Sequence, residues 1–305
     1  MTRHEPKTCR VSRDIELAYD EFGTRDAPVI LLISGLGTQM IRWTGEFCAA
    51  LAEQGYRIIR FDNRDAGLST HLNDMPPPDF TALVGDIMAG RMPAVPYGLG
   101  DMAADAIGLM DALSIDRAHV VGRSMGGMIA QIMACDAPDR ILSLTSIMSS
   151  TGNPSLPQAE PDVMAMMAQP KPDPENFICS SLAFARRIAG DTQHFDEAAH
   201  RALLVAELQR SHDPAGAARQ LAAMATAGDR RSNLAKLQLP ALVIHGSKDP
   251  LIPPASGKDT AAAIPGAELL TLEGMGHDLP PEFFAPVIDA IHRTARSATG
   301  RSNDR

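Results

Sequence analysis

Short, continuous apolar runs recur along the chain and are separated by polar turns or by segments with helical periodicity. Runs of five to eight apolar residues are typical of buried strands in a parallel sheet, where helices cover both faces. We expect strands at 28–33, 56–61, 118–122, 141–148, 240–246 and 267–272. A stretch at 11–22 alternates apolar and polar side chains, which predicts a half-exposed early strand or hairpin.

Segments with apolar positions three or four residues apart lie between these runs. They predict helices at 43–54, 82–89, 101–113, 128–134 and 281–293, and a frayed polar tail at 297–305. Strands that alternate with helices favour an α/β fold. The prediction is therefore a mostly parallel central sheet flanked by helices.

The pattern changes between residues 149 and 232. Six prolines are followed by alanine-rich helical segments near 177–189, 196–209 and 214–227, and no strand-like run interrupts them. We interpret residues 149–232 as an inserted helical cap, and residues 1–148 and 233–305 as the core that it interrupts.

One strand runs directly into a G-x-S-x-G motif, Gly122 to Gly126, followed at once by an apolar helical run. A serine at a sharp strand-to-helix turn is a nucleophile elbow. The glycines are needed because side chains at their positions would clash where strand and helix approach closely. Ser124 is therefore the predicted nucleophile.

Two further candidates follow later strands. Asp249 comes after the strand at 240–246, and His277 lies in a glycine-containing loop after the strand at 267–272. Functional groups in parallel sheets gather at the carboxyl ends of the strands. The chain order Ser124, Asp249, His277 thus predicts a catalytic triad. Asp278 is an alternative acid. However, a side chain next to His277 in sequence is poorly placed to hydrogen-bond the imidazole nitrogen that faces away from the serine.

The expected chemistry is acyl transfer. His277 takes the proton of Ser124 as the hydroxyl attacks a carbonyl, and Asp249 orients the imidazole and stabilises its charged form. The oxyanion should be bound by two backbone N–H groups, those of Met125 and Leu36.

With these residues in place, the chain resembles the α/β-hydrolase fold family over nearly its whole length. Ser34-Gly35-Leu36-Gly37 is similar to the family's His-Gly-x-x oxyanion segment, with serine in place of histidine. The loop 62–69 resembles the family's D-x-R-G-x-G-x-S loop, with Asp65-Ala66 where the family has Gly-x, so that it departs from the pattern at Asp65. That variant, with residues 118–122 and 274–277, is similar to the aclacinomycin methylesterase branch, which cleaves methyl esters of polyketides. The resemblance implies the fold and esterase chemistry but not the polyketide substrate.

Two smaller interpretations concern side chains outside the triad. Met164 and Met167 in the cap could line an acyl pocket, since methionine adapts to varied apolar shapes, or could pack the helix core. Arg64 and Asp65 are interpreted as structural charges that bond each other and the backbone.

Composition and charge indicate which partners, cofactors and cellular location to expect. The formal net charge of −9 argues against a nucleic-acid partner. The four cysteines lack metal-ligand or disulfide spacing, so we expect no metal and no cofactor. There is no signal peptide and no run long enough to cross a membrane, which favours a cytoplasmic location. The expected partner is a small-molecule ester, and a homodimer is left open.

The sequence thus predicts a serine carboxylic ester hydrolase, a methylesterase among the options, acting on small to medium apolar esters. Cofactor-free haloperoxidases (perhydrolases), lactonases and carbon–carbon hydrolases use similar triads and remain alternatives. A non-catalytic ligand receptor is disfavoured because the complete catalytic set is retained.

Overall fold

A single eight-stranded sheet forms the centre of the computed structural model, which describes residues 6–168, 174–191 and 195–301. The strand order is β1-β2-β4-β3-β5-β6-β7-β8. The first two strands pair antiparallel, β2 also pairs antiparallel with β4, and the later pairs are parallel. The strands are β1 (Lys7–Arg10), β2 (Glu16–Phe22), β3 (Val29–Ile33), β4 (Arg57–Phe61), β5 (Ala118–Arg123), β6 (Ile141–Ile147), β7 (Ala241–Gly246) and β8 (Glu268–Leu272).

Both faces of the sheet are covered, as the continuous apolar runs predict. Along β3, Leu31 and Ile33 pack into one hydrophobic cluster, whereas Ile30 and Leu32 pack into the other. Successive side chains of a strand point to opposite faces, so only an uninterrupted apolar run supplies both clusters. The α/β prediction is therefore confirmed.

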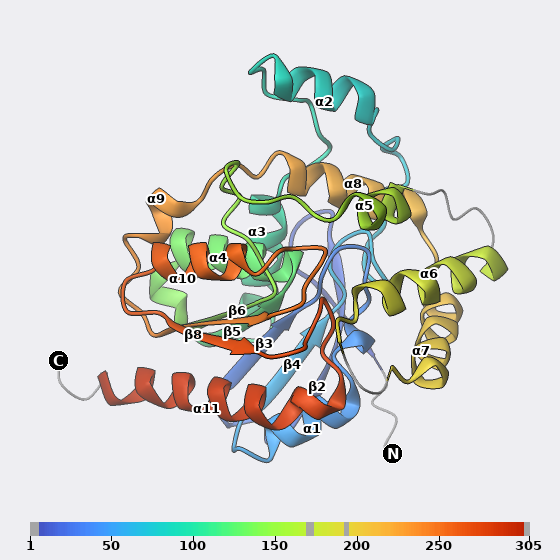
Figure 1. Ribbon diagram of the computed structural model, residues 1–305. Helices are drawn as coiled ribbons and strands as arrows, with labels where there is room; N and C mark the ends of the chain where they lie inside the picture. The colour runs from blue at the N-terminus through green and yellow to red at the C-terminus, as the bar shows by residue number, and fades with distance from the viewer. Residues whose placement is uncertain (1–5, 169–173, 192–194, 302–305) are drawn as a thin grey trace.

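Figure 1 shows α1 and α11 on one face of the sheet and α3, α4 and α10 on the other. The helices outside the insertion at 149–232 are η1 (Met40–Arg42), α1 (Gly45–Ala52), α2 (Phe80–Met88), α3 (Leu99–Ala112), α4 (Met125–Asp136), η2 (Pro138–Arg140), α10 (Ala255–Ala263), η3 (Pro281–Phe283) and α11 (Phe284–Arg301).

Two predicted boundaries were wrong. The early hairpin turns at residues 11–15, where the N–H of Val11 donates to Ile15 O, so its first strand precedes Val11. The last helix extends through Arg301, although we expected fraying from Ser297. Ala295 and Ala298 bury their methyl groups on the core side, and this packing outweighs the polar composition of the segment.

The chain between β6 and β7 is helical, as expected, and contains α5 (Pro161–Ala168), α6 (Pro174–Ile188), α7 (Glu197–Arg210), α8 (Pro214–Ala225) and α9 (Arg231–Leu234). Helix α5 was not anticipated because it lies in a proline-rich stretch. Pro161 is the first residue of α5, the position in a helix where the missing N–H costs nothing.

Candidate functional site

Ser124 lies between β5 and α4 in a strained conformation, with φ of 54° and ψ of −124°. The two glycines of the motif permit this turn. A Cβ atom at Gly122 would lie 2.0 Å from Gly126 O, and one at Gly126 would lie 2.2 Å from Ile33 O. Both distances are far below contact, so only glycine fits. At this position the strained backbone presents the Ser124 hydroxyl.

His277 connects Ser124 to Asp249 by hydrogen bonds. Its Nε2 lies 3.0 Å from the Oγ of Ser124, and its Nδ1 lies 2.7 Å from Oδ2 of Asp249. The three residues come from the ends of β5, β7 and β8, which are far apart in sequence. A neutral imidazole in this position can accept the serine proton at Nε2 while Nδ1–H donates to the carboxylate.

The Asp249 carboxylate is buried and held from several sides. Its Oδ1 accepts from the N–H groups of Leu251 and Ile252, both at 2.9 Å. Burial acts to raise the pKa of this carboxyl, but the imidazoles of His277 and His245 outweigh it and hold the pKa well below its usual range. The carboxylate is therefore ionised throughout the neutral range.

His245 is a neighbour of Asp249 that we did not anticipate. Its Nε2 lies 3.5 Å from Oδ2 of Asp249 and donates to Ile252 O at 2.8 Å. The signal in the sequence is a polar residue inside the buried strand β7, four positions before the aspartate.

Asp278 does not contact the His277 imidazole through any hydrogen bond found in the described residues. Its carboxylate lies 3.3 Å from Nε2 of His200, on α7. Burial acts to raise the pKa of Asp278, but His200 and Arg123 lower it to about 2. The geometry thus favours Asp249 over Asp278 as the partner of His277.

The loop after β3 lies beside the serine. A Cβ atom built at Gly35 would lie 3.3 Å from Cβ of Ser124. Leu36 follows in this loop, and Met125 is the first residue of α4. Within the described chain, no hydrogen bond is found for the N–H of either residue. Two free backbone donors on either side of Ser124 are what an oxyanion requires.

The helical segment between β6 and β7 forms hydrogen bonds with two loops of the site, the loop after β3 and the loop after β8. Gln220 of α8 accepts from the N–H of Gly37 at 2.8 Å. At the end of α6, Ile188 O accepts from the N–H of His277 at 2.6 Å, and Ala189 O accepts from Gly276 at 3.0 Å. The loops that carry Leu36 and His277 are therefore fixed by residues from outside the sheet.

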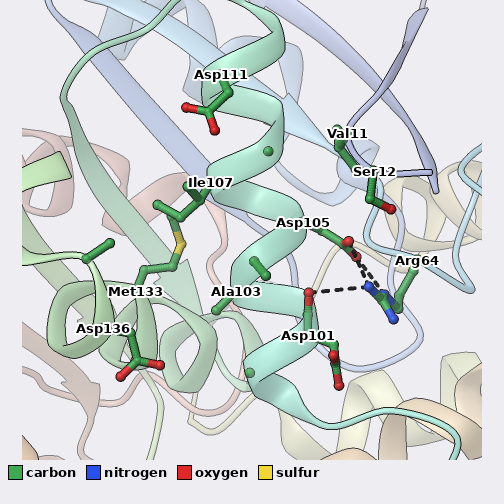
Figure 2. A pocket seen from close by; sticks show the side chains of 14 residues that line it. Val11, Ser12, Arg64, Asp101, Ala103, Asp105, Ile107, Asp111, Met133 and Asp136 are labelled. Carbon is green, nitrogen blue, oxygen red and sulfur yellow. Dashed lines mark hydrogen bonds and ion pairs between the residues drawn. The ribbon is translucent and has the colours of Figure 1, made fainter. Parts of the chain in front are cut away.

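Arg64 and Asp65 do not pair with each other, which corrects our expectation. Arg64 Nε lies 2.6 Å from Asp105 on α3, beside a hollow of about 590 Å³ that Figure 2 shows. Asp65 instead pairs with Arg219 of α8 at 2.7 Å. None of the residues that line the hollow belongs to the Ser124 site. The loop is structural, as expected, but its partners are distant helices.

Asp65, His71 and Asp213 form the cluster in the described residues that most resembles a metal site. Their ligand atoms lie within 4.8 Å of one another. However, the Arg219 guanidinium bonds Asp65 at 2.7 Å and approaches Asp213 at 3.4 Å. The arginine already supplies the positive charge that a cation would bring, so the residues fit an ion-pair network better than a metal.

Met164 and Met167, the two predicted pocket residues, both lie in α5. The Met164 side chain is exposed and that of Met167 is half-buried. Neither residue belongs to the hydrophobic clusters of the described residues, and their place in an acyl pocket stays a prediction.

The family model described as the alpha/beta hydrolase fold matches residues 28–283. This chain belongs to the α/β-hydrolase fold family. The match spans the β3 loop, the elbow, the inserted helices and the loops after β7 and β8, so the family assignment covers every candidate residue named above.

Two relatives are similar over most of their length. Rhodomycin D methylesterase DnrP of Streptomyces peucetius is 31% identical over 90% of this chain and 92% of its own. Rhodomycin D methylesterase DauP of Streptomyces sp. (strain C5) is 32% identical with the same coverage. The crystal structure of the enol-lactonase from Burkholderia xenovorans LB400 is 24% identical, covers 96% of this chain and 100% of its own, and has a TM-score of 0.68. That last likeness supports the fold alone.

The helices of the described residues do not include one that is both long and apolar enough to cross a membrane.

Proposed function

We propose that this protein is a serine carboxylic ester hydrolase that acts through an acyl-enzyme. The observation that carries the proposal is the hydrogen-bonded series from Ser124 Oγ through His277 to Asp249, at 3.0 and 2.7 Å. This geometry provides an activated nucleophile beside two free backbone donors.

In the proposed mechanism, His277 Nε2 accepts the Ser124 proton as Oγ attacks the ester carbonyl. The negative charge on the carbonyl oxygen is bound by the N–H groups of Leu36 and Met125. When the tetrahedral intermediate collapses, the C–O bond to the alcohol breaks and the imidazolium protonates the leaving alcohol. Water, deprotonated by His277, then attacks the acyl-enzyme and releases the acid. Asp249 stabilises the imidazolium in both steps.

The proposed substrates are small to medium esters with an apolar body, and methyl esters are the first choice. The support is the likeness to two proteins named rhodomycin D methylesterase, each over nine-tenths of this chain. Because a methyl leaving group offers few contacts to the enzyme, the acyl part of the ester would determine substrate specificity almost entirely.

Residues 149–232 are proposed to act as a cap on the site, with Met164 and Met167 toward the acyl group. Support comes from the contacts that α6 and α8 make with the His277 loop and with Gly37. A cap held to the catalytic loops can exclude water from the acyl-enzyme and shape the pocket.

The test is turnover of short-chain p-nitrophenyl esters and methyl esters, together with labelling by a fluorophosphonate serine probe. We expect hydrolysis and a single labelled residue, Ser124. A protein that hydrolyses no ester and is not labelled would refute the proposal. Faster turnover of lactones, dienoates or peroxide than of esters would replace it with one of the related activities on this fold.

A further inference from the structure

Arg123, the residue directly before Ser124, carries a guanidinium that has no carboxylate within ion-pair distance in the described residues. Its Nη1 lies 3.5 Å from Arg42 O, and its guanidinium carbon lies 5.4 Å from the ring centroid of Trp43. The side chain is half-buried. A backbone carbonyl at that distance and an aromatic face are weak partners for a cation withdrawn from water.

The carboxylates that face Arg123 are already bonded to other residues. Glu207 of α7 binds Arg42 through two hydrogen bonds of 2.8 and 2.7 Å. Asp278 lies 3.3 Å from His200. Burial lowers the pKa of Arg123 to about 10, because the attraction of Asp278 and Glu207 only partly offsets it. The guanidinium is therefore charged at neutral pH and incompletely stabilised.

An unused donor lies in the same place. The indole Nε1 of Trp43 is buried and has no hydrogen-bond partner in the described residues. Trp43 is only 1% exposed and directly follows η1. A donor without an acceptor, beside a guanidinium that makes a single long hydrogen bond, favours a ligand that brings acceptor oxygens.

We propose that Arg123 binds a carboxylate in the acyl part of the substrate, so that preferred substrates are methyl half-esters of dicarboxylic acids with an apolar spacer. This rests on the proposed esterase function. Arg123 directly precedes Ser124, so the proposed anion site is carried by the residue next to the nucleophile. An arginine matches a carboxylate through two parallel hydrogen bonds and would fix the orientation of the acyl chain.

The experiment compares kcat/KM for monomethyl succinate, glutarate and adipate with the corresponding neutral dimethyl esters. We expect the native enzyme to prefer at least one half-ester by about 10-fold or more. Arg123→Met should lower kcat/KM for that half-ester about 10- to 100-fold and change the dimethyl ester less than about 3-fold. Arg123→Lys should retain part of the preference, and Arg91→Met, an exposed arginine on the chain after α2, should leave both rates unchanged.

Binding is measured separately from turnover, by calorimetry with monomethyl adipate and the Ser124→Ala protein. Loss of binding on adding Arg123→Met, with weaker but measurable binding for Arg123→Lys and an unchanged circular dichroism spectrum for both, supports the anion site even if hydrolysis is slow. Equal kcat/KM for half-esters and dimethyl esters, unaffected by both Arg123 variants, overturns the inference and leaves the esterase function standing. Failure to hydrolyse any ester, with Ser124 unlabelled, refutes the esterase function instead.

Discussion

Nδ1 of His277 lies 2.7 Å from Oδ2 of Asp249, while the adjacent Asp278 turns to His200 on α7. The two aspartates offer a direct comparison. Asp249→Asn should lower kcat about 10³- to 10⁴-fold, because an amide cannot stabilise the imidazolium. Asp278→Asn should cost about 10-fold at most. Steady-state kinetics on one methyl ester measures both, and the reverse order of losses would assign the acid to Asp278.

Replacing the nucleophile should abolish catalysis without unfolding the protein. Ser124→Ala removes Oγ, the atom that forms the acyl-enzyme, and we expect at least a 10³-fold loss of kcat (roughly, by analogy with other serine hydrolases). The alanine tolerates the same backbone as serine, so the thermal midpoint should change little. Residual activity near the native level, in protein free of contaminating esterase, would point to another nucleophile.

Acidification should lower the rate before it unfolds the protein. A protonated imidazole cannot accept the Ser124 proton, so kcat/KM should fall on acidification as His277 becomes protonated. The pKa of Asp249 is held below its usual range, so its carboxylate stays ionised while this occurs. Its stabilising contribution is present above the ordinary carboxyl pKa and is lost only as the pH falls toward the lowered value. A rate profile that is flat from neutral to mildly acidic pH would contradict a histidine base.

Glycine at position 126 is a steric requirement. Gly126→Ala would bring a methyl group to 2.2 Å from Ile33 O, and we expect destabilisation of about 1–3 kcal/mol or loss of soluble protein. Gly85→Ala is the control, since no atom lies within 4 Å of the added Cβ in the exposed part of α2. That variant should be neutral or more stable by about 0.5–1 kcal/mol. Chemical denaturation measures both, and equal stability of the two variants would refute the close approach of β3 and α4.

The sequence was sufficient for features that depend on nearby residues. The apolar run at Val29–Ile33 identifies a strand buried on two faces, and the spacing of Gly122, Ser124 and Gly126 identifies the elbow. Strand ends also identify Asp249 and His277 as candidates, because parallel strands deliver their following loops to one edge of the sheet.

Features that depend on long-range pairing could not be predicted. Asp65 and Arg219 are 154 positions apart, and nothing in the sequence around either residue indicates which residue it pairs with. The same holds for Arg123, whose isolation is visible only once Glu207 and Asp278 are known to be bonded elsewhere. Local patterns specify backbone geometry, whereas charge pairing is decided by packing.

Gln220 bonds Gly37 N–H through Oε1 and Arg64 O through Nε2, at 2.8 and 2.7 Å. One amide of α8 thereby joins the loop before η1 to the loop after β4. A chimaera in which residues 149–232 are exchanged for those of another esterase would lose this brace unless the glutamine is carried over. Exchanges of the helical insertion that aim to alter substrate preference should therefore keep glutamine at position 220, because it holds two loops that follow strands of the sheet.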